Sequence, residues 1–214
     1  MSGAPAPGAS GRPRIAVLDY EIGNLRSAQK ALEVNGADAR LTADPAEIEA
    51  ADGVVLPGVG AFGACMQALA DTGLDVQAKA AAASGRPFLG ICVGMQLLHE
   101  GSDESPDAPG LGLLPGRVRW LPDGVKRPQM QWNRLDVRQP HPLLDGLDGS
   151  WLYFVHSLAP EATEAVVATT DYGGEVVAAV ARDNVMATQF HPEKSARPGM
   201  RLLSNFVAML GERR

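Results

Sequence analysis

Cysteine and histidine are both scarce in this sequence of 214 residues. With only Cys65 and Cys92, the chain cannot form the disulfide framework typical of small secreted domains. We therefore expect a reduced, cytoplasmic protein. The four histidines are dispersed along the chain, at positions 99, 141, 156 and 191. No cysteine and histidine pair has the spacing of a zinc site, so the sequence predicts no metal centre.

Long apolar runs and an excess of positive charge are also missing. No apolar run approaches the roughly 20 residues of a membrane-spanning helix. Acidic residues outnumber lysine and arginine by 25 to 19, and the net charge of −6 argues against general affinity for nucleic acid. Residues 1–13 are rich in Gly, Ala, Pro and Ser and lack the apolar centre of a signal peptide. We expect them to form a disordered leader before a single domain at 14–214.

The first half of the chain alternates between strand-like and helix-like patterns. Continuous apolar runs, typical of strands buried on both faces, occupy residues 14–20, 53–60 and 86–91. Helical spacing of apolar residues follows each run, from Leu25 to Gly36, over 62–84 with a break near Thr72-Gly73, and over 93–100. This alternation predicts an α/β fold with a mostly parallel central sheet flanked by helices on both sides.

The second half of the chain is richer in short β-type runs. A polar stretch at 101–110 is expected to be a loop. The later runs predict antiparallel additions that make the sheet mixed, and they cover residues 116–121, 151–158, 165–170, 175–181 and 184–190. Apolar residues at helical spacing from Pro198 to Leu210 predict a final amphipathic helix.

Cys92 stands between two glycines where a buried strand gives way to a helix. In Gly90-Ile91-Cys92-Val93-Gly94, the small neighbours allow a tight turn whose central residue is strained, as in a nucleophile elbow. The N-terminus of the following helix favours a thiolate. The motif alone also fits a small buried residue, which most free cysteines are. Cys65 lies within a helical pattern, and we expect it only to pack in the core.

A histidine and an acid that could serve Cys92 lie near the C-terminus. His191 follows a strand and precedes Pro192, which favours an extended backbone at the histidine. Residues two apart in an extended segment project to the same face, so Glu193 can lie beside His191. A lone histidine at a strand end is more often a solvated loop residue. The acid two residues later instead favours a Cys–His–Glu triad, in which the acid orients the histidine and the histidine faces the thiol.

A glycine-rich loop follows the run at 53–60. Its sequence LPGVGAFG, at 56–63, lacks the Lys-Ser/Thr ending of a Walker loop and the glycine spacing of dinucleotide-binding loops. Phosphate binding is therefore the weaker interpretation. Facing Cys92, the loop would instead donate backbone N–H groups of Val59 or Gly60 to an oxyanion. The N–H of Val93 is the other expected donor.

Three motifs, PGVG, GICVGMQLL and HPEKS, occur in this order along the chain. Together they resemble the class I (triad) glutamine amidotransferase family. LDYEIGNLRS near the N-terminus, PxMxWN at 128–133 and YFVHS at 153–157 resemble one branch of that family, the glutaminase subunits of imidazole glycerol phosphate synthase. The likeness extends from Arg14 essentially to the C-terminus. It implies a flavodoxin-like α/β fold and no cofactor.

The resemblance implies a reaction and a set of site residues. Cys92 would attack the side-chain amide carbon of glutamine, His191 would pass the thiol proton to the leaving ammonia, and Glu193 would orient His191. The resulting γ-glutamyl thioester would be hydrolysed to glutamate. Val59 and Val93 would form the oxyanion hole. The residues implied in glutamine binding are Gly58, Gly60, Gln96, His156 and Ser157.

The resemblance also implies a partner. The ammonia would pass to a (β/α)8-barrel cyclase subunit, in a heterodimer that makes imidazole glycerol phosphate and aminoimidazole-carboxamide ribonucleotide for histidine biosynthesis. The residues implied in contacts with the cyclase are Asn24, Trp132, Asn133, Tyr153 and Lys194. The other tryptophans, Trp120 and Trp151, are expected in the core.

Three positions depart from the family pattern. The segment that usually reads PHMGWN is PQMQWN here, with Gln129 and Gln131, and Leu158 stands where tyrosine usually follows YFVHS. If glycine is needed at 131 for a positive φ or a close backbone approach, Gln131 requires a rearrangement. These segments are expected to face the partner or the glutamine pocket. The departures therefore bear on coupling to the partner more than on the triad.

Two alternatives remain open at the level of sequence. The chain could be the glutaminase component of another amidotransferase, such as anthranilate synthase. It could also be a catalytically silent binding subunit of the same fold, although the intact triad argues against this. Co-purification with a barrel cyclase or with a chorismate-using subunit would decide between the two catalytic interpretations.

Overall fold

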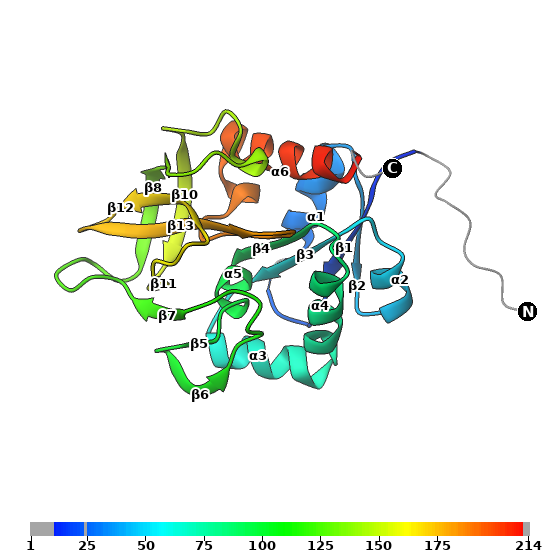
Figure 1. Cartoon of the computed structure of the whole chain (residues 1–214), viewed down its shortest axis with the longest axis horizontal. Helices are drawn as coiled ribbons and strands as arrows, with labels where there is room; N and C mark the ends of the chain where they lie inside the picture. The colour runs from blue at the N-terminus through cyan, green and yellow to red at the C-terminus, as the bar shows by residue number, and fades with distance from the viewer. Residues whose placement is uncertain (1–10, 24, 212–214) are drawn as a thin grey trace, which may run out of the picture.

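The computed structural model describes residues 11–23 and 25–211, so the expected leader lies almost wholly outside the described residues. A large sheet separates two layers of helices (Figure 1). Its eight strands follow the order β2-β1-β3-β4-β14-β13-β12-β9.

Most neighbouring strands of this sheet are parallel. The parallel part consists of β2 (Asp38–Thr42), β1 (Arg14–Leu18), β3 (Gly53–Gly58), β4 (Phe88–Cys92) and β14 (Val185–Thr188). The antiparallel extension consists of β13 (Glu175–Arg182), β12 (Val166–Asp171) and β9 (Asp136–Val137). The mixed, mostly parallel sheet predicted from the sequence is confirmed.

Helices cover both faces of the sheet. On one face, α1 (Leu25–Val34) packs against α6 (Ala196–Gly211), the predicted final helix (Figure 1). The other face carries α2 (Pro45–Glu49), α3 (Phe62–Asp71), α4 (Leu74–Ala83) and α5 (Val93–Leu97). The predicted break at Thr72-Gly73 is confirmed between α3 and α4, where Gly73 has a φ of 70°. Across the described residues, none of the helices is long and apolar enough to cross a lipid bilayer.

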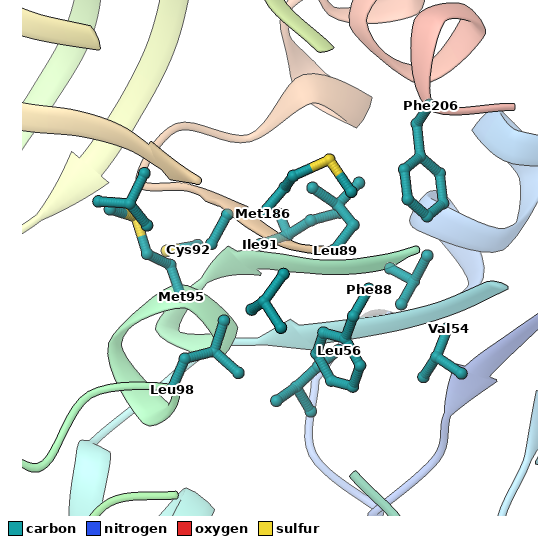
Figure 2. Packing of buried hydrophobic residues seen from close by; sticks show 14 of the residues in the cluster. Val54, Leu56, Phe88, Leu89, Ile91, Cys92, Met95, Leu98, Met186 and Phe206 are labelled. Carbon is teal, nitrogen blue, oxygen red and sulfur yellow. The ribbon is translucent and has the colours of Figure 1, made fainter. Parts of the chain in front are cut away.

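Side chains of the parallel strands fill both interfaces between sheet and helices. The register places Val54 beside Phe88, and Met186 beside Leu89. Figure 2 shows Phe88 and Val54 on one side of the sheet, whereas Leu89 and Met186 lie on the other side, toward Phe206 of α6. All five side chains are fully buried. Burial on both faces accounts for the continuous apolar runs of β3 and β4.

Two smaller sheets lie on the side of the molecule remote from β2 (Figure 1). A four-stranded sheet contains β11 (Leu158–Pro160), β7 (Arg117–Trp120), β5 (Gly101–Ser102) and β6 (Ser105–Pro109). An antiparallel ribbon pairs β8 (Gln129–Arg134) with β10 (Trp151–His156). Two short 3-10 helices complete the elements, η1 (Pro142–Leu144) and η2 (Pro192–Lys194).

The sequence patterns miss α2 and the strands β2, β8 and β9. The edge strand β2 buries only Ala39 and Thr42, so no continuous apolar run marks it. The five residues of α2 are too few to show helical periodicity. The prediction of a loop at 101–110 is also wrong, because β5 and β6 pair there. No residue of β6 is buried, which explains its polar sequence.

The sequence patterns do not reveal the position of β14 in the sheet, between β4 and β13. The run at 184–190 is expected as an antiparallel addition, but β14 is antiparallel only to β13 and is parallel to β4. This insertion places the segment after β14 next to the segment after β4. Two further expectations are wrong. The helix after Cys92 ends at Leu97 rather than at position 100, and the runs at 116–121 and 151–158 form β7, β10 and β11 of the smaller sheets instead of joining the main sheet.

Candidate active site

Three segments meet at the carboxyl ends of the adjacent strands β3, β4 and β14. The register places Gly58 beside Cys92, and Thr188 beside Ile91. The glycine-rich loop, Cys92 and His191 therefore leave the same edge of the sheet. Open α/β sheets bind their ligands at this edge, outside the carboxyl ends of the strands.

Cys92 occupies a strained turn between β4 and α5. Its φ of 55° and ψ of −113° lie in a region that non-glycine residues rarely adopt. The turn requires glycine at 94, because a Cβ there would lie 1.8 Å from the carbonyl oxygen of Leu56. A Cβ on Gly58 would lie 2.7 Å from the backbone nitrogen of Gly94. The strained elbow predicted from G-x-C-x-G is therefore confirmed.

His191 and Glu193 lie side by side, as their spacing predicts. The His191 backbone is extended, and its Nδ1 lies 2.8 Å from Oε1 of Glu193. Cys92 and His191 line the same cavity. Burial by itself lowers the pKa of His191, but its interactions with Cys92 and Glu193 outweigh this effect and raise the pKa to about 9. His191 is therefore protonated at neutral pH, between a sulfur and a carboxylate.

The side chain of Ser195 links the backbone of His191 to the backbone of Tyr153 in β10. Its hydroxyl donates to the carbonyl of His191 at 2.6 Å and accepts from the N–H of Tyr153 at 2.9 Å. The N–H of His191 in turn donates to the carbonyl of Tyr153 at 3.0 Å. Ser195 was not predicted as a site residue. Its place in HPEKS is the only signal in the sequence, and no spacing rule assigns a role to it.

Two buried side chains hold the glycine-rich loop. The hydroxyl of Tyr20 donates to the carbonyl of Pro57 at 2.6 Å, and the thiol of Cys65 donates to the carbonyl of Val59 at 3.3 Å. The two carbonyls flank Gly58. Burial raises the pKa of Cys65 to about 11, which keeps its thiol protonated as a donor. Cys65 is buried as predicted, but the expectation that it only packs is too narrow.

A cavity of about 260 Å³ opens beside Cys92. Of the residues expected at the site, it is lined by Cys92, His191, Val59, Gly60, Val93, Gln96, His156, Ser157 and Lys194. Gly58 is buried and does not line the cavity. The lining residues that the sequence analysis misses are Glu104, Pro128 and Val155, together with Leu158, which it notes only as a departure.

Gln96 presents a hydrogen-bond acceptor to this cavity. Its Nε2 donates to the carbonyl of Leu158 at 3.0 Å and to Oε1 of Gln189 at 3.1 Å. Nitrogen is the bonded atom, because a carbonyl oxygen can only accept. Both amide hydrogens are thereby used, and Oε1 is the atom that Gln96 can offer to a ligand.

His156 presents a second acceptor. Its Nδ1 lies 2.8 Å from the carbonyl of Leu158, so Nδ1 carries the proton and Nε2 has the lone pair. Nε2 is buried and has no partner among the described residues. Burial lowers the pKa of His156 to about 4, so the ring is neutral at neutral pH.

Glu104 brings a carboxylate to the cavity from the turn between β5 and β6. Its Oε2 accepts from the N–H of Phe62 at 2.7 Å, at the start of α3. Glu104 was not predicted as a site residue, because it lies in the polar stretch that was expected to be a loop.

The structure shows where the three departures from the family pattern lie. Gln131 lies opposite Phe154 in the ribbon with no positive φ, so its own backbone does not require glycine. Leu158 contributes its backbone carbonyl, which any side chain supplies. Gln129 lies opposite His156 and is fully buried. Its amide has no hydrogen-bond partner within the described part of the chain.

One face of the β8–β10 ribbon is apolar and exposed. Met130, Trp132 and Trp151 are 63%, 43% and 55% exposed, and the rings of Trp132 and Tyr153 pack edge to face at 6.1 Å. The expectation that Trp151 lies in the core is therefore wrong. Trp120, which is 46% exposed, was likewise expected in the core. Both lie on strands with one open face, where period-two alternation places every second side chain outward.

The remaining expected interface residues differ in where they lie. Asn133 alternates with Trp132 and donates its Nδ2 to the carbonyl of Asp171 at 2.8 Å, so its amide is bonded within the chain. Lys194 lines the cavity. Asn24 lies outside the described residues.

The assembled groups are those of acyl transfer through a thioester. A sulfur, an imidazole and a buried carboxylate lie together beside a small cavity with hydrogen-bond acceptors. Among the described residues, no three His, Cys, Asp or Glu side chains are grouped so that they could hold a metal ion.

The sequence model described as glutamine amidotransferase class-I matches residues 16–210. The chain belongs to this class-I glutamine amidotransferase family. The amidotransferase is 50% identical over 200 residues to a Symbiobacterium thermophilum protein named imidazole glycerol phosphate synthase subunit HisH, with 92% of this chain and 94% of the relative covered. It is 51% identical over 205 residues to the protein of the same name from Synechococcus elongatus, with 92% and 94% covered.

Solved structures agree with this fold. One described as a glutamine amidotransferase has a TM-score of 0.74 at 23% identity, covering 92% of the class-I amidotransferase described here and 98% of the solved chain. One described as PurLQS from Thermotoga maritima has a TM-score of 0.74 at 21% identity, with 93% and 99% covered.

Proposed function

We propose that this class-I glutamine amidotransferase is the glutaminase subunit of imidazole glycerol phosphate synthase. It hydrolyses glutamine and delivers the ammonia to a cyclase subunit in histidine biosynthesis, within the cytoplasm. The single domain at 14–214 carries the activity. The observation that carries the proposal is the buried Cys92–His191–Glu193 arrangement beside an open cavity. Relatives about half identical over most of their length, all named HisH subunits, support the choice within the family.

The reaction follows from the positions of the three groups. The sulfur of Cys92 attacks the carboxamide carbon of glutamine, and the oxyanion develops toward Val59 and Val93, which line the cavity. His191 gives its proton to the departing nitrogen, which leaves as ammonia, and a γ-glutamyl thioester remains. His191 then takes a proton from water as the water attacks the thioester, and glutamate and the thiolate are released. Glu193 holds the imidazole in place through its bond to Nδ1.

The polar groups of the cavity match glutamine rather than glutamate. Gln96 and His156 each present an acceptor, and Glu104 adds a carboxylate. Acceptors of this kind bind the N–H groups of a carboxamide and an α-ammonium group. Glutamate has a second carboxylate in place of the carboxamide. That carboxylate cannot donate hydrogen bonds to the acceptors of the cavity, so the cavity would bind glutamate poorly.

The exposed face of the β8–β10 ribbon is the surface we assign to the (β/α)8-barrel cyclase. The ribbon is continuous with the cavity, because Val155 of β10 and Pro128 before β8 line it. Exposed Trp132 and partly buried Tyr153 provide rigid aromatic contact area of the kind that dominates protein interfaces. Lys194, at the rim of the cavity, supplies a cation at the same place. A partner bound here would receive ammonia directly from the site.

The identity of the partner tests the proposal. The chain is mixed separately with a barrel cyclase subunit and with a chorismate-using subunit from one source, and complex formation is measured by size-exclusion chromatography. We expect a complex with the cyclase that forms imidazole glycerol phosphate from glutamine. A complex formed only with the chorismate-using subunit would instead identify an anthranilate synthase component. If the chain binds the cyclase without hydrolysing glutamine, the silent-subunit alternative is correct.

A further inference from the structure

Gln189 is a buried amide beside the nucleophile that none of the expected roles includes. It follows β14 directly and is fully buried. Its Nε2 lies 3.9 Å from the sulfur of Cys92, and its Oε1 accepts from Nε2 of Gln96 at 3.1 Å. The side chain thus lies between a residue of the glutamine pocket and the sulfur that would react.

Its amide can have only one orientation. The carbonyl of Leu158 can only accept, so the atom of Gln96 that faces both Leu158 and Gln189 is the nitrogen. The atom of Gln189 that receives this bond must then be its oxygen. The NH2 group of Gln189 therefore faces Cys92, and a flip would place two donors against each other.

The backbone holds this amide on the side of His191. The N–H of Gln189 donates to the carbonyl of Ala178 at 2.9 Å, on the neighbouring strand β13. Gln189 and His191 are two apart in an extended segment, so both side chains project toward the nucleophile. Phe190 between them projects the other way and packs against Phe154, with ring centroids 5.5 Å apart.

We propose that Gln189 is a further catalytic residue. Its side-chain N–H donates to the sulfur of Cys92, and its side-chain oxygen accepts a hydrogen bond from Gln96. The inference rests on the proposed function in that it takes Cys92 to be the nucleophile. The sulfur carries negative charge as it attacks and again when the thioester is cleaved, and the side chain of Cys92 is buried. A second donor besides His191 stabilises it, because hydrogen bonds to charged groups are strong in a site of low dielectric.

Two substitutions distinguish the hydrogen bond that Gln189 donates to the sulfur of Cys92 from the one that it accepts from Gln96. Gln189→Glu keeps an oxygen to accept from Gln96 and loses the donor to sulfur. Gln189→Leu loses both. Gln77→Leu, on α4 and remote from the cavity, is the matched control. Alkylation of Cys92 by iodoacetamide is followed from pH 5 to pH 9, since this reaction reports the thiolate and requires neither partner nor glutamine. Thermal unfolding is measured in parallel.

We expect the midpoint of the alkylation profile to rise by about 1 pH unit in both Gln189 variants and to stay unchanged in the control. In the complex with the cyclase, kcat for glutamine should fall roughly tenfold in both. KM should rise only in Gln189→Leu, where Gln96 loses its partner. If Gln189→Leu fails to fold, the nearly isosteric Gln189→Glu carries the test. Alkylation profiles that superimpose on that of the unsubstituted chain would overturn the inference. A shifted profile in a chain that binds no cyclase would uphold it and overturn the proposed function alone.

Discussion

The backbone N–H of His191 donates a hydrogen bond to the carbonyl of Tyr153, at a distance of 3.0 Å. The hydroxyl of Ser195 is hydrogen-bonded to the backbone of both residues. Tyr153 belongs to β10, whose outward face is the surface assigned to the cyclase. A movement of β10 when the partner binds would therefore be transmitted to the histidine of the triad without an intervening side chain.

Ser195→Ala tests this connection. The substitution leaves the N–H of Tyr153 and the carbonyl of His191 without their hydroxyl partner. We expect a loss of about 1–3 kcal/mol in the free energy of unfolding, together with a lower kcat. Urea denaturation and a glutamate-release assay measure the two effects. Ser204→Ala, at an exposed position of α6, is the control. A Ser195→Ala variant with the kcat of the control would show that this contact does not position His191.

Tyr20→Phe tests whether the hydrogen bond from Tyr20 positions the glycine-rich loop. It removes the donor to the carbonyl of Pro57, and we expect kcat to fall by about three- to tenfold, the equivalent of one ordinary hydrogen bond. Iodoacetamide alkylation of Cys92 should be unchanged, because that reaction forms no oxyanion. Cys65→Ala should act in the same way, whereas Cys65→Ser keeps a donor to Val59 and should retain more activity. Equal loss in both Cys65 variants would contradict this role for the thiol.

Two buried histidines predict opposite dependences of stability on pH. The pKa of His191 is about 9 in the folded state, above the roughly 6.5 of an unfolded histidine. Its contribution is therefore complete below pH 6.5 and is lost as the pH rises through 9. The pKa of His156 is about 4, so its contribution is complete above pH 6.5 and is lost as the pH falls toward 4.

Stability from these two groups should thus be greatest near neutral pH. Urea denaturation from pH 4 to pH 9.5 checks this. His191→Gln should flatten the alkaline decline and His156→Gln the acidic one. An alkaline decline that His191→Gln leaves intact would mean that another group causes it.

Gly94→Ala tests the nucleophile elbow. The added Cβ would lie 1.8 Å from the carbonyl oxygen of Leu56, which is backbone and cannot move aside. We expect the variant to lose at least about 3 kcal/mol of stability, or not to fold. Gly211→Ala, where a Cβ meets no atom within 4 Å, is the control. A stable Gly94→Ala variant with normal activity would contradict the geometry described for the turn.

The sequence allowed the triad to be predicted because each part depends on local geometry. The elbow at Cys92 needs small neighbours, and Glu193 faces His191 because they are two apart in an extended segment. The same two-residue spacing, applied backwards, points to Gln189, but glutamine carries no charge to draw attention to it. Glu104, Ser195 and Tyr20 could not be predicted, because each reaches the site through contacts between segments distant in the sequence.

The order of the strands in the main sheet also could not be predicted from the sequence. Nothing local to 185–188 indicates that β14 pairs with β4, because pairing of parallel strands depends on how the whole sheet is packed. Edge elements were missed for a related reason. β2, β6 and β8 each have an open face, so they lack the continuous apolar runs that marked β3 and β4.

The central claim is that Cys92 makes ammonia for a bound cyclase. Formation of imidazole glycerol phosphate by the complex carrying Cys92→Ala tests it most directly, with glutamine and free ammonia compared as nitrogen sources. We predict that synthesis from glutamine is abolished and that synthesis from ammonia is unchanged, since the substitution leaves the partner intact. Synthesis from glutamine that survives the loss of the Cys92 sulfur would contradict the account.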